Sequence, residues 1–243
     1  MAFIPNTHQL TREQISILSY DEKLHYYEYL CEHPSINNGN GKTGPGCATI
    51  SMPVHETCRH DAPCYLCKVC YCLKGRQCFA NVLGAYKRNY RLYKQNPERF
   101  KEMVIAILKC SGLPLCRWND SGELVDKEYF LLTVDVAKAL PDIKFLCYTK
   151  KYDIVNEWLD EGNQFPENYT MRFSYLGKDW EVPNPHNLPV AYIDFTDKSL
   201  NPDIPRNAFK CQGNATEDDL EHTCTACKMC WNKRVHSVVF AQH

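Results

Sequence analysis

Apolar and polar residues follow two spacings along the middle of the chain, one typical of helices and one typical of strands. Helical spacing covers residues 126–140 and 154–160. Apolar runs typical of buried strands cover residues 113–118, 143–149, 169–176 and 190–195. Strands that alternate with helices indicate crossover connections between parallel strands. The pattern therefore predicts an α/β fold with a mainly parallel sheet flanked by helices.

The segments before this region divide into helical and irregular parts. Residues 12–31 have the spacing of one or two short helices. Residues 81–109 predict two further helices that are separated at Asn96-Pro97, because asparagine caps a helix and proline suits its first turn. Residues 31–80 are rich in Gly, Pro, Asn and Cys with little periodicity, which indicates irregular backbone organised by something other than an apolar core.

The predicted sheet also indicates where a ligand binds, because ligands of parallel sheets usually lie at the carboxyl ends of the strands. Three of these ends fall at residues 119–123, 148–151 and 174–177. For the whole chain we expect three parts. They are a helical segment over residues 1–40, an α/β core over residues 41–205 and a cysteine-rich extension over residues 206–243.

Composition and charge exclude several classes of protein. With 44% apolar and 23% charged residues, the 243-residue chain has the composition of a globular protein. Its formal net charge of −1 gives no overall attraction to nucleic acid or to anionic membranes. The first residues lack a basic segment followed by an apolar one, and no apolar run is long enough to cross a bilayer. We therefore expect a cytoplasmic protein without membrane association.

Cysteines supply the candidate chemistry. The chain has 15 cysteines, and two segments each contain Cys-x2-Cys-x2-Cys with a further cysteine upstream. A reducing cytoplasm disfavours disulfides and favours metal ligation, and thiols at every third residue among polar residues do not suit an apolar core. The predicted metal ligands are Cys58, Cys64, Cys67, Cys70, Cys211, Cys224, Cys227 and Cys230.

The spacing favours iron–sulfur chemistry over zinc. It is similar to the run of cysteines that holds a [4Fe–4S] cluster in ferredoxins, whereas structural zinc sites more often use paired cysteines. Zinc remains the alternative. Four thiolates close a cluster, and three leave one iron open to a substrate or cofactor. The number of clusters, one or two, stays open, because Cys72 and Cys78 add thiols to the first segment and the segments could share ligands.

The isolated cysteines are predicted to be small buried hydrophobic residues instead of ligands. Three of them lie in or beside apolar runs. The five are Cys31, Cys47, Cys110, Cys116 and Cys147.

Several motifs together resemble the gene-product-88-like proteins of phages and bacteria. They are the segment from Thr57 to Cys72, Asn81, Arg88-Asn89, Arg117 to Glu123, Tyr148 to Lys150, and a terminal Cys-x2-Cys-x2-Cys-Trp followed by Val-x-Phe-x-x-His. The match covers about residues 42–243, and the order of the motifs is more specific than any one of them. The resemblance implies cysteine-bound metal without implying a particular reaction.

A looser resemblance links the chain to radical S-adenosylmethionine enzymes. These place a three-cysteine cluster before a parallel, partial-barrel-like sheet, and a Gly-Gly-Glu element after a strand holds the methionine end of the cofactor. Here the segment from Asp120 to Glu123 follows a predicted strand, although the usual Cys-x3-Cys-x2-Cys spacing is missing and one glycine is replaced. The residues that this resemblance assigns to S-adenosylmethionine are Asn119, Asp120, Ser121, Gly122 and Glu123.

The same resemblance implies roles for single groups. Glu123 would accept a hydrogen bond from the cofactor's ammonium group, an electron donor would be the partner, and a second cluster would relay electrons. No catalytic residue is identified. The alternative for residues 119–123 is a turn that caps a helix after a strand.

A second hypothesis is a zinc-stabilised module that binds nucleic acid or a protein without catalysis. Tyr86, Tyr90 and Tyr93 share one helical face and are interleaved with lysines and arginines. This combination can stack bases and neutralise phosphates. The same tyrosines could instead pack on the core while the cations stay solvated.

Overall fold

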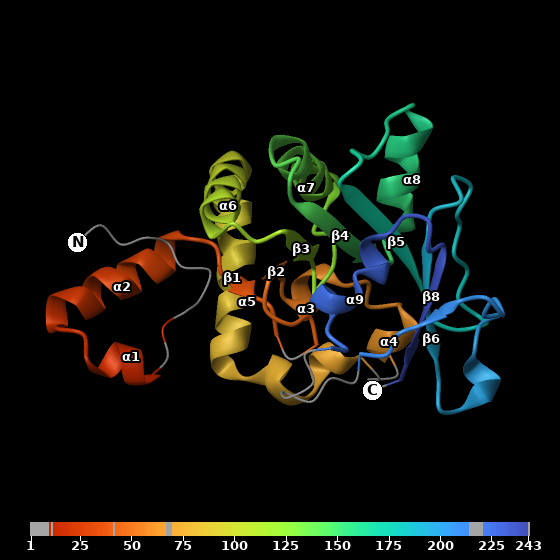
Figure 1. Cartoon of the computed structure of the whole chain (residues 1–243), viewed down its shortest axis with the longest axis horizontal. Coiled ribbons are helices and arrows are strands. Elements are labelled where there is room, and N and C mark those ends of the chain that lie inside the picture. The colour runs from red at the N-terminus through yellow and green to blue at the C-terminus, as the bar shows by residue number, and fades with distance from the viewer. Residues whose placement is uncertain (1–9, 11, 41, 67–69, 214–220, 243) are drawn as a thin grey trace.

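The computed structural model describes residues 10, 12–40, 42–66, 70–213 and 221–242. These residues form an eight-stranded sheet in the order β1-β2-β3-β4-β5-β6-β8-β7 (Figure 1). Neighbouring strands are parallel except β1 and β2, which are antiparallel. The strands are β1 (Ile36–Asn38), β2 (Cys47–Ile50), β3 (Leu115–Trp118), β4 (Lys144–Thr149), β5 (Tyr169–Tyr175), β6 (Val190–Asp194), β7 (Phe209–Lys210) and β8 (Ser237–Ala241).

Helices join successive parallel strands. Two of them connect β2 to β3, one connects β3 to β4, and one connects β4 to β5; they are α5 (Ala80–Gln95), α6 (Pro97–Ser111), α7 (Lys127–Ala139) and α8 (Tyr152–Asp160). Figure 1 shows α1 (Arg12–Ser16) and α2 (Tyr20–Glu32) standing away from this body. The short helices are α3 (Val54–Thr57), α4 (Pro63–Leu66), α9 (Cys224–Cys227), η1 (Tyr71–Leu73), η2 (Gly75–Cys78), η3 (Lys198–Leu200) and η4 (Met229–Trp231).

The predicted break between α5 and α6 lies at Asn96-Pro97. Asn96 Oδ1 accepts a hydrogen bond from the backbone nitrogen of Arg99 at 3.0 Å, and Pro97 occupies the first turn, where no N–H is needed. We expect Asn96→Ala to lower the free energy of unfolding by about 1 kcal/mol, because the cap is lost. Urea unfolding measures this difference. Substitution of the neighbouring exposed Gln95 by alanine is the control, and equal effects of the two substitutions would contradict the role of the cap.

One face of the sheet packs against α5, α6, α7 and α8. Successive side chains of a strand point to opposite faces, so alternate residues of each strand reach these helices. Trp118, Phe145 and Tyr169 stack in a row across β3, β4 and β5, with ring centroids 6.4 Å and 6.5 Å apart, and all three are fully buried. Cys116 and Cys147 lie on the same face and are also fully buried, which confirms their prediction as small hydrophobic residues.

One of the isolated cysteines differs from its prediction. Cys110 is exposed, because it lies on the side of α6 away from Phe100 and Val104, which face the core. Whether Cys110 is buried depends on which side of the helix it occupies. That it lies in an apolar stretch of sequence does not decide this. The side chain of Cys31 lies outside the described part of the structure.

Figure 1 shows α3, α4 and α9 on the other side of the sheet from α6, α7 and α8, and η4 packs there against β4 and β5. Trp231 is buried there, and its Nε1 donates to two backbone carbonyl oxygens of β3 and β4 at 3.3 Å and 3.1 Å. Arg172 of β5 is fully buried and donates to the carbonyl oxygens of Cys230 and Asn232 at 2.8 Å and 3.1 Å. Breaking these charge-assisted bonds leaves buried groups unsatisfied, so they hold the C-terminal cysteine segment on the sheet.

The predicted α/β class and the mainly parallel sheet with flanking helices are confirmed. The predicted central strands correspond to β3, β4, β5 and β6. Residues 31–80, predicted to be irregular, also contain β1 and β2, and residues 206–243 contribute β7 and β8 to the same sheet. None of the helices in the described residues is long and apolar enough to cross a bilayer.

Candidate metal centre

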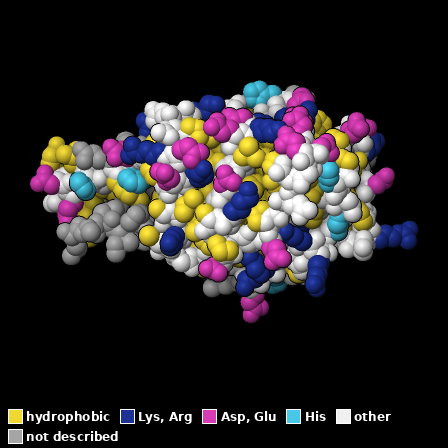
Figure 2. All heavy atoms as spheres, turned by 90° about the horizontal axis from the view of Figure 1, so that it is seen from above, with side chains coloured by type: hydrophobic (Ala, Val, Ile, Leu, Met, Phe, Trp, Pro, Cys, Tyr) yellow, Lys and Arg dark blue, Asp and Glu magenta, His cyan; other side chains and the backbone are white. Residues whose placement is uncertain are grey.

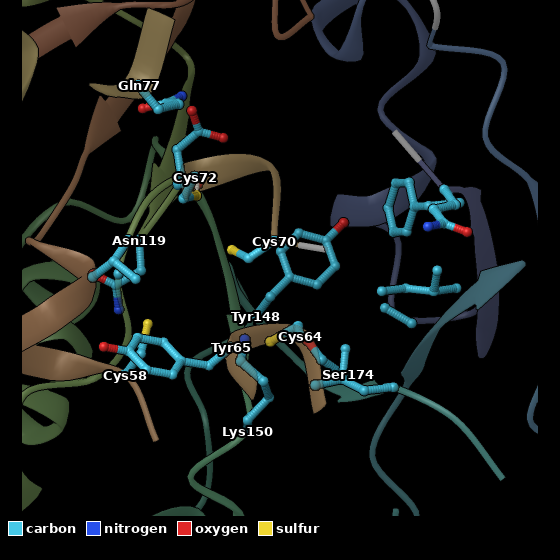
Figure 3. A pocket seen from close by; sticks show the side chains of 18 of the residues that line it. Cys58, Cys64, Tyr65, Cys70, Cys72, Gln77, Asn119, Tyr148, Lys150 and Ser174 are labelled. Atoms are coloured by element: carbon cyan, nitrogen blue, oxygen red, sulfur yellow. Dashed lines mark hydrogen bonds between the residues drawn. The ribbon is translucent and has the colours of Figure 1, made fainter. Parts of the chain in front are cut away.

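A cavity of about 410 Å³ lies at the carboxyl ends of the parallel strands, on the face opposite α6, α7 and α8 (Figure 3). Each strand from β3 to β6, and β8, contributes a residue to its wall. These residues include Arg117, Tyr148, Ser174, Ile193 and Ala241. The location agrees with the ligand position predicted for a parallel sheet.

Four thiols form one wall of this cavity. Cys58, Cys64, Cys70 and Cys72 all line it, and all come from the segment after β2 (Figure 3). Short turns bring them together, since the backbone nitrogen of Cys70 donates to the carbonyl oxygen of Cys64 at 3.1 Å. Cys67 lies outside the described residues. The structure thus gathers three of the four predicted ligands of this segment and adds Cys72, whose role the sequence left open.

Hydrogen bonds connect these thiols. The pKa of Cys70 is lowered because its thiolate accepts hydrogen bonds from Cys64 and Cys72, and the pKa values of these two donors are raised by the same bonds. Burial raises the pKa of Cys58 to about 12. The Sγ atom of Cys72 also lies 3.6 Å from the carbonyl oxygen of Asp120, so the thiol wall touches the turn after β3.

That turn, residues 119–123, is built against the chain that comes after β2. The backbone nitrogen of Met52 donates to the carbonyl oxygen of Ser121 at 3.0 Å, and the backbone nitrogen of Glu123 donates to Thr57 Oγ1 at 3.0 Å. Gly122 has a φ of 79°, and a Cβ atom there would lie 2.3 Å from the Met52 carbonyl oxygen. The close approach of the two segments therefore requires glycine at this position.

The five residues assigned to a cofactor divide into two groups. Asn119, Asp120 and Gly122 line the cavity, whereas Ser121 and Glu123 are buried in hydrogen bonds. Of the three residues that line the cavity, Asp120 is itself engaged, because its Oδ2 accepts from Asn40 Nδ2 at 2.8 Å and its Oδ1 lies 3.1 Å from Arg117 Nη1.

Glu123 is engaged by the protein itself. Its Oε2 accepts from the backbone nitrogen of Lys150 at 2.7 Å and lies 3.3 Å from Lys150 Nζ, while its Oε1 accepts from the backbone nitrogen of Leu124 at 3.0 Å. Burial alone lowers the pKa of Lys150, but Glu123, Cys64 and Cys58 raise it above its ordinary value. A lysine ammonium group is therefore held beside the thiol wall.

Asn119 offers a donor to the cavity. It is buried with a φ of 53°, and its Oδ1 accepts from the hydroxyl of Tyr129 at 3.3 Å. Its Nδ2 has no hydrogen-bond partner within the described structure, and Figure 3 shows the side chain on the same side of the cavity as Cys58. A buried donor without a partner is costly, so this amide fits a site that is completed by a bound acceptor such as a sulfide or a carboxylate.

A cation and an aromatic ring form the floor between the two cysteine segments. Arg117 Nη1 lies 3.1 Å from Asp120 Oδ1, and its guanidinium carbon lies 5.1 Å from the centroid of the Tyr148 ring. Tyr148 in turn hydrogen-bonds to the thiol of Cys230. The C-terminal cysteines therefore lie directly behind the cavity wall.

Three of the four predicted ligands of the C-terminal segment, Cys211, Cys224 and Cys230, lie near enough to interact electrostatically. Burial raises the pKa of Cys224 to about 11, a net value that Arg117 lowers and the nearby thiols of Cys230 and Cys211 raise. Cys227, at the end of α9, is exposed. Among the residues that the structure describes, no three His, Cys, Asp or Glu side chains are gathered closely enough to hold a single metal ion.

The tyrosines of α5, the basic helix considered above as a nucleic-acid-binding surface, are not free to bind a nucleic acid. Tyr86 and Tyr93 are buried, and Tyr90 packs against the core. The first two also bind neighbouring side chains through their hydroxyls, Tyr86 to Gln77 and Tyr93 to Asp126. Acidic and basic side chains are interspersed over the face shown in Figure 2. The tyrosines thus adopt the core-packing alternative and are not presented for base stacking.

Comparison with known proteins agrees with the motif pattern. The family model described as Gene product 88 matches residues 19–233. Neither a curated protein nor a solved structure gives a significant match to the chain. The matched range includes both cysteine segments and every parallel strand up to β6, and the chain therefore belongs to the gene product 88 family.

Proposed function

We propose that this protein is an iron–sulfur protein whose first cluster is held at the cavity by the cysteines after β2. Cys58, Cys64 and Cys70, together with Cys67 from the same segment, would supply the thiolates, with Cys72 as an alternative ligand. Such a cluster would supply one-electron chemistry and, with three thiolates bound, an open iron. The observation that carries this proposal is the wall of four thiols in a cavity at the carboxyl ends of a parallel sheet.

The donor set supports iron–sulfur chemistry over harder metals, because thiolates are soft ligands. A cubane binds each thiolate at a different iron, so its ligands are spaced more widely than those of a single ion. The unpaired Nδ2 of Asn119 and the ammonium group of Lys150 face the thiols and would stabilise the negative charge of a thiolate-bound cluster.

We further propose that the cavity binds S-adenosylmethionine beside this cluster. The order of elements supports this, because the cysteines come after the first parallel strand, β2, and the turn at residues 119–123 comes after the next, β3. The connecting helices all pack on one face, as in a barrel, and leave the other face for ligands. Asn119, Asp120 and Gly122 line the cavity and would contact the cofactor. Glu123 would support them indirectly through Lys150.

Electron paramagnetic resonance of the dithionite-reduced protein tests this proposal. We expect S-adenosylmethionine to change the spectrum of the reduced cluster, since it would bind at an open iron. We also expect methionine and 5′-deoxyadenosine as products, because one electron from dithionite would break a carbon–sulfur bond of the sulfonium, and the 5′-deoxyadenosyl fragment would become 5′-deoxyadenosine by gaining a hydrogen atom from substrate or buffer. The Cys70→Ala variant is the control and should show neither effect. An unchanged spectrum without products would contradict cofactor binding.

A further inference from the structure

A glycine-rich loop from the N-terminal part of the chain is docked onto the C-terminal cysteine segment. The backbone nitrogens of Cys224 and Thr225 donate to the carbonyl oxygens of Lys42 and Thr43 at 3.1 Å and 3.0 Å. Gly44 has a φ of 73°, and a Cβ atom there would lie 2.6 Å from Thr225 Oγ1. The loop thus fits α9 only without a side chain at this position, and it fixes the start of β2 relative to Cys224.

Cys47 directly follows this loop in the sequence. It is the first residue of β2, it is fully buried, and it points to the face that carries the cysteine segments. There it belongs to the same packed cluster as Cys224 and Cys230. Burial raises the pKa of Cys47 to about 12, a net value to which the nearby Cys224 thiol contributes and which Arg117 opposes. Cys116 of the adjacent strand β3, which lies opposite Ala48, instead points to the helices.

The C-terminal cysteines need a fourth thiol if they are to hold a metal cluster without Cys227. Cys224 and Cys230 pack in the same cluster as Cys47, and the Cys211 thiol is near enough to raise the pKa of both, whereas Cys227 is exposed at the end of α9. A buried thiol such as that of Cys47, which packs beside Cys224, is better placed to complete this group than an exposed one.

We propose that Cys47 is a ligand of the C-terminal metal centre, together with Cys211, Cys224 and Cys230. This inference rests on the proposed function and extends it, because it requires that the C-terminal cysteines hold a second cluster like the one proposed for the cysteines after β2. It means that the centre is built from the first parallel strand and the last cysteine segment, and that metal binding joins parts of the chain far apart in sequence. Cys227 is then a surface residue that is not required.

The test uses a background in which the first centre is removed by Cys64→Ala and Cys70→Ala together. In this background, Cys47→Ala, Cys227→Ala and the matched control Cys116→Ala are reconstituted with iron and sulfide. We expect Cys47→Ala to lose most of the bound iron and sulfide and the accompanying visible absorbance, while the other two variants retain them. Because Cys47 and Cys116 are both fully buried on adjacent strands, the control separates ligation from the packing effect of removing a thiol.

Cobalt titration gives a second measure. The thiolate-to-cobalt charge-transfer absorbance grows with the number of bound thiolates, so it should fall in Cys47→Ala and stay unchanged in Cys227→Ala. Far-ultraviolet circular dichroism confirms that each variant is folded. Retention of iron and cobalt absorbance by Cys47→Ala, or their loss in Cys227→Ala alone, would overturn the inference and leave the proposed function intact. A background protein that is folded by circular dichroism but binds no metal would overturn the C-terminal centre itself.

Discussion

Substitution of Cys70 by alanine is expected to abolish metal binding at the cavity and to lower the free energy of unfolding by more than about 4 kcal/mol. The thiol of Cys70 is hydrogen-bonded to those of Cys64 and Cys72, so it occupies the centre of the thiol wall. The chain around it consists of short turns without a large apolar core of its own, and metal-binding energy would be folding energy for such a segment. Guanidinium unfolding of the anaerobically purified protein, monitored by circular dichroism, measures the loss.

The control for this substitution is Cys110→Ala. Cys110 is exposed on α6, so its removal should change the free energy of unfolding by no more than about 0.5 kcal/mol. Similar unfolding curves for the two variants would show that Cys70 contributes no more than a surface thiol. That result would contradict a metal centre at the cavity.

Gly122→Ala is expected to lower the free energy of unfolding by about 3 kcal/mol and to weaken ligand binding at the cavity. Alanine at a φ of 79° is strained, and its Cβ atom would lie 2.3 Å from the Met52 carbonyl oxygen and 2.8 Å from Thr57 Oγ1. The turn after β3 and the chain after β2 would have to separate. This separation would also displace Asp120, whose carbonyl oxygen touches Cys72.

The control substitution Gly112→Ala separates the cost of backbone strain at a positive φ from the cost of the close contact of the added Cβ atom. Gly112 also has a positive φ, 63°, at the end of α6, but a Cβ atom there would meet nothing within 4 Å. Its substitution should therefore cost only the backbone strain, about 1 kcal/mol. Urea unfolding of both variants gives the difference, and equal losses would mean that the close contact at Gly122 contributes nothing.

The part of the fold with strong periodicity could be predicted from the sequence. Asn96-Pro97 marks its helix start, and the apolar runs at residues 143–149 and 169–176 become β4 and β5 because each is buried on both faces. β2 could not be found in this way. Its four residues, Cys47 to Ile50, are all buried, lie among glycines, and are too short to show any period.

The candidate site was predicted in part for a similar reason. Local spacing identified the cysteine segments, and strand order placed the turn at residues 119–123 beside the ligand position. Spacing cannot show which face of a sheet a residue reaches or which side of a short helix meets solvent. Cys47 and Cys227 are therefore the residues for which the sequence was least informative. The ion pair of Glu123 with Lys150 also depends on strands that are distant in sequence.

The iron, sulfide and zinc content of anaerobically purified protein tests the central claim most directly. The proposed centres predict brown protein with about four irons and four sulfides for each occupied cluster. They also predict that the double variant, with Cys64→Ala and Cys70→Ala, contains less iron and, in the same proportion, less sulfide. Colourless protein that contains zinc and no sulfide, or that contains no metal, would contradict an iron–sulfur function for this chain.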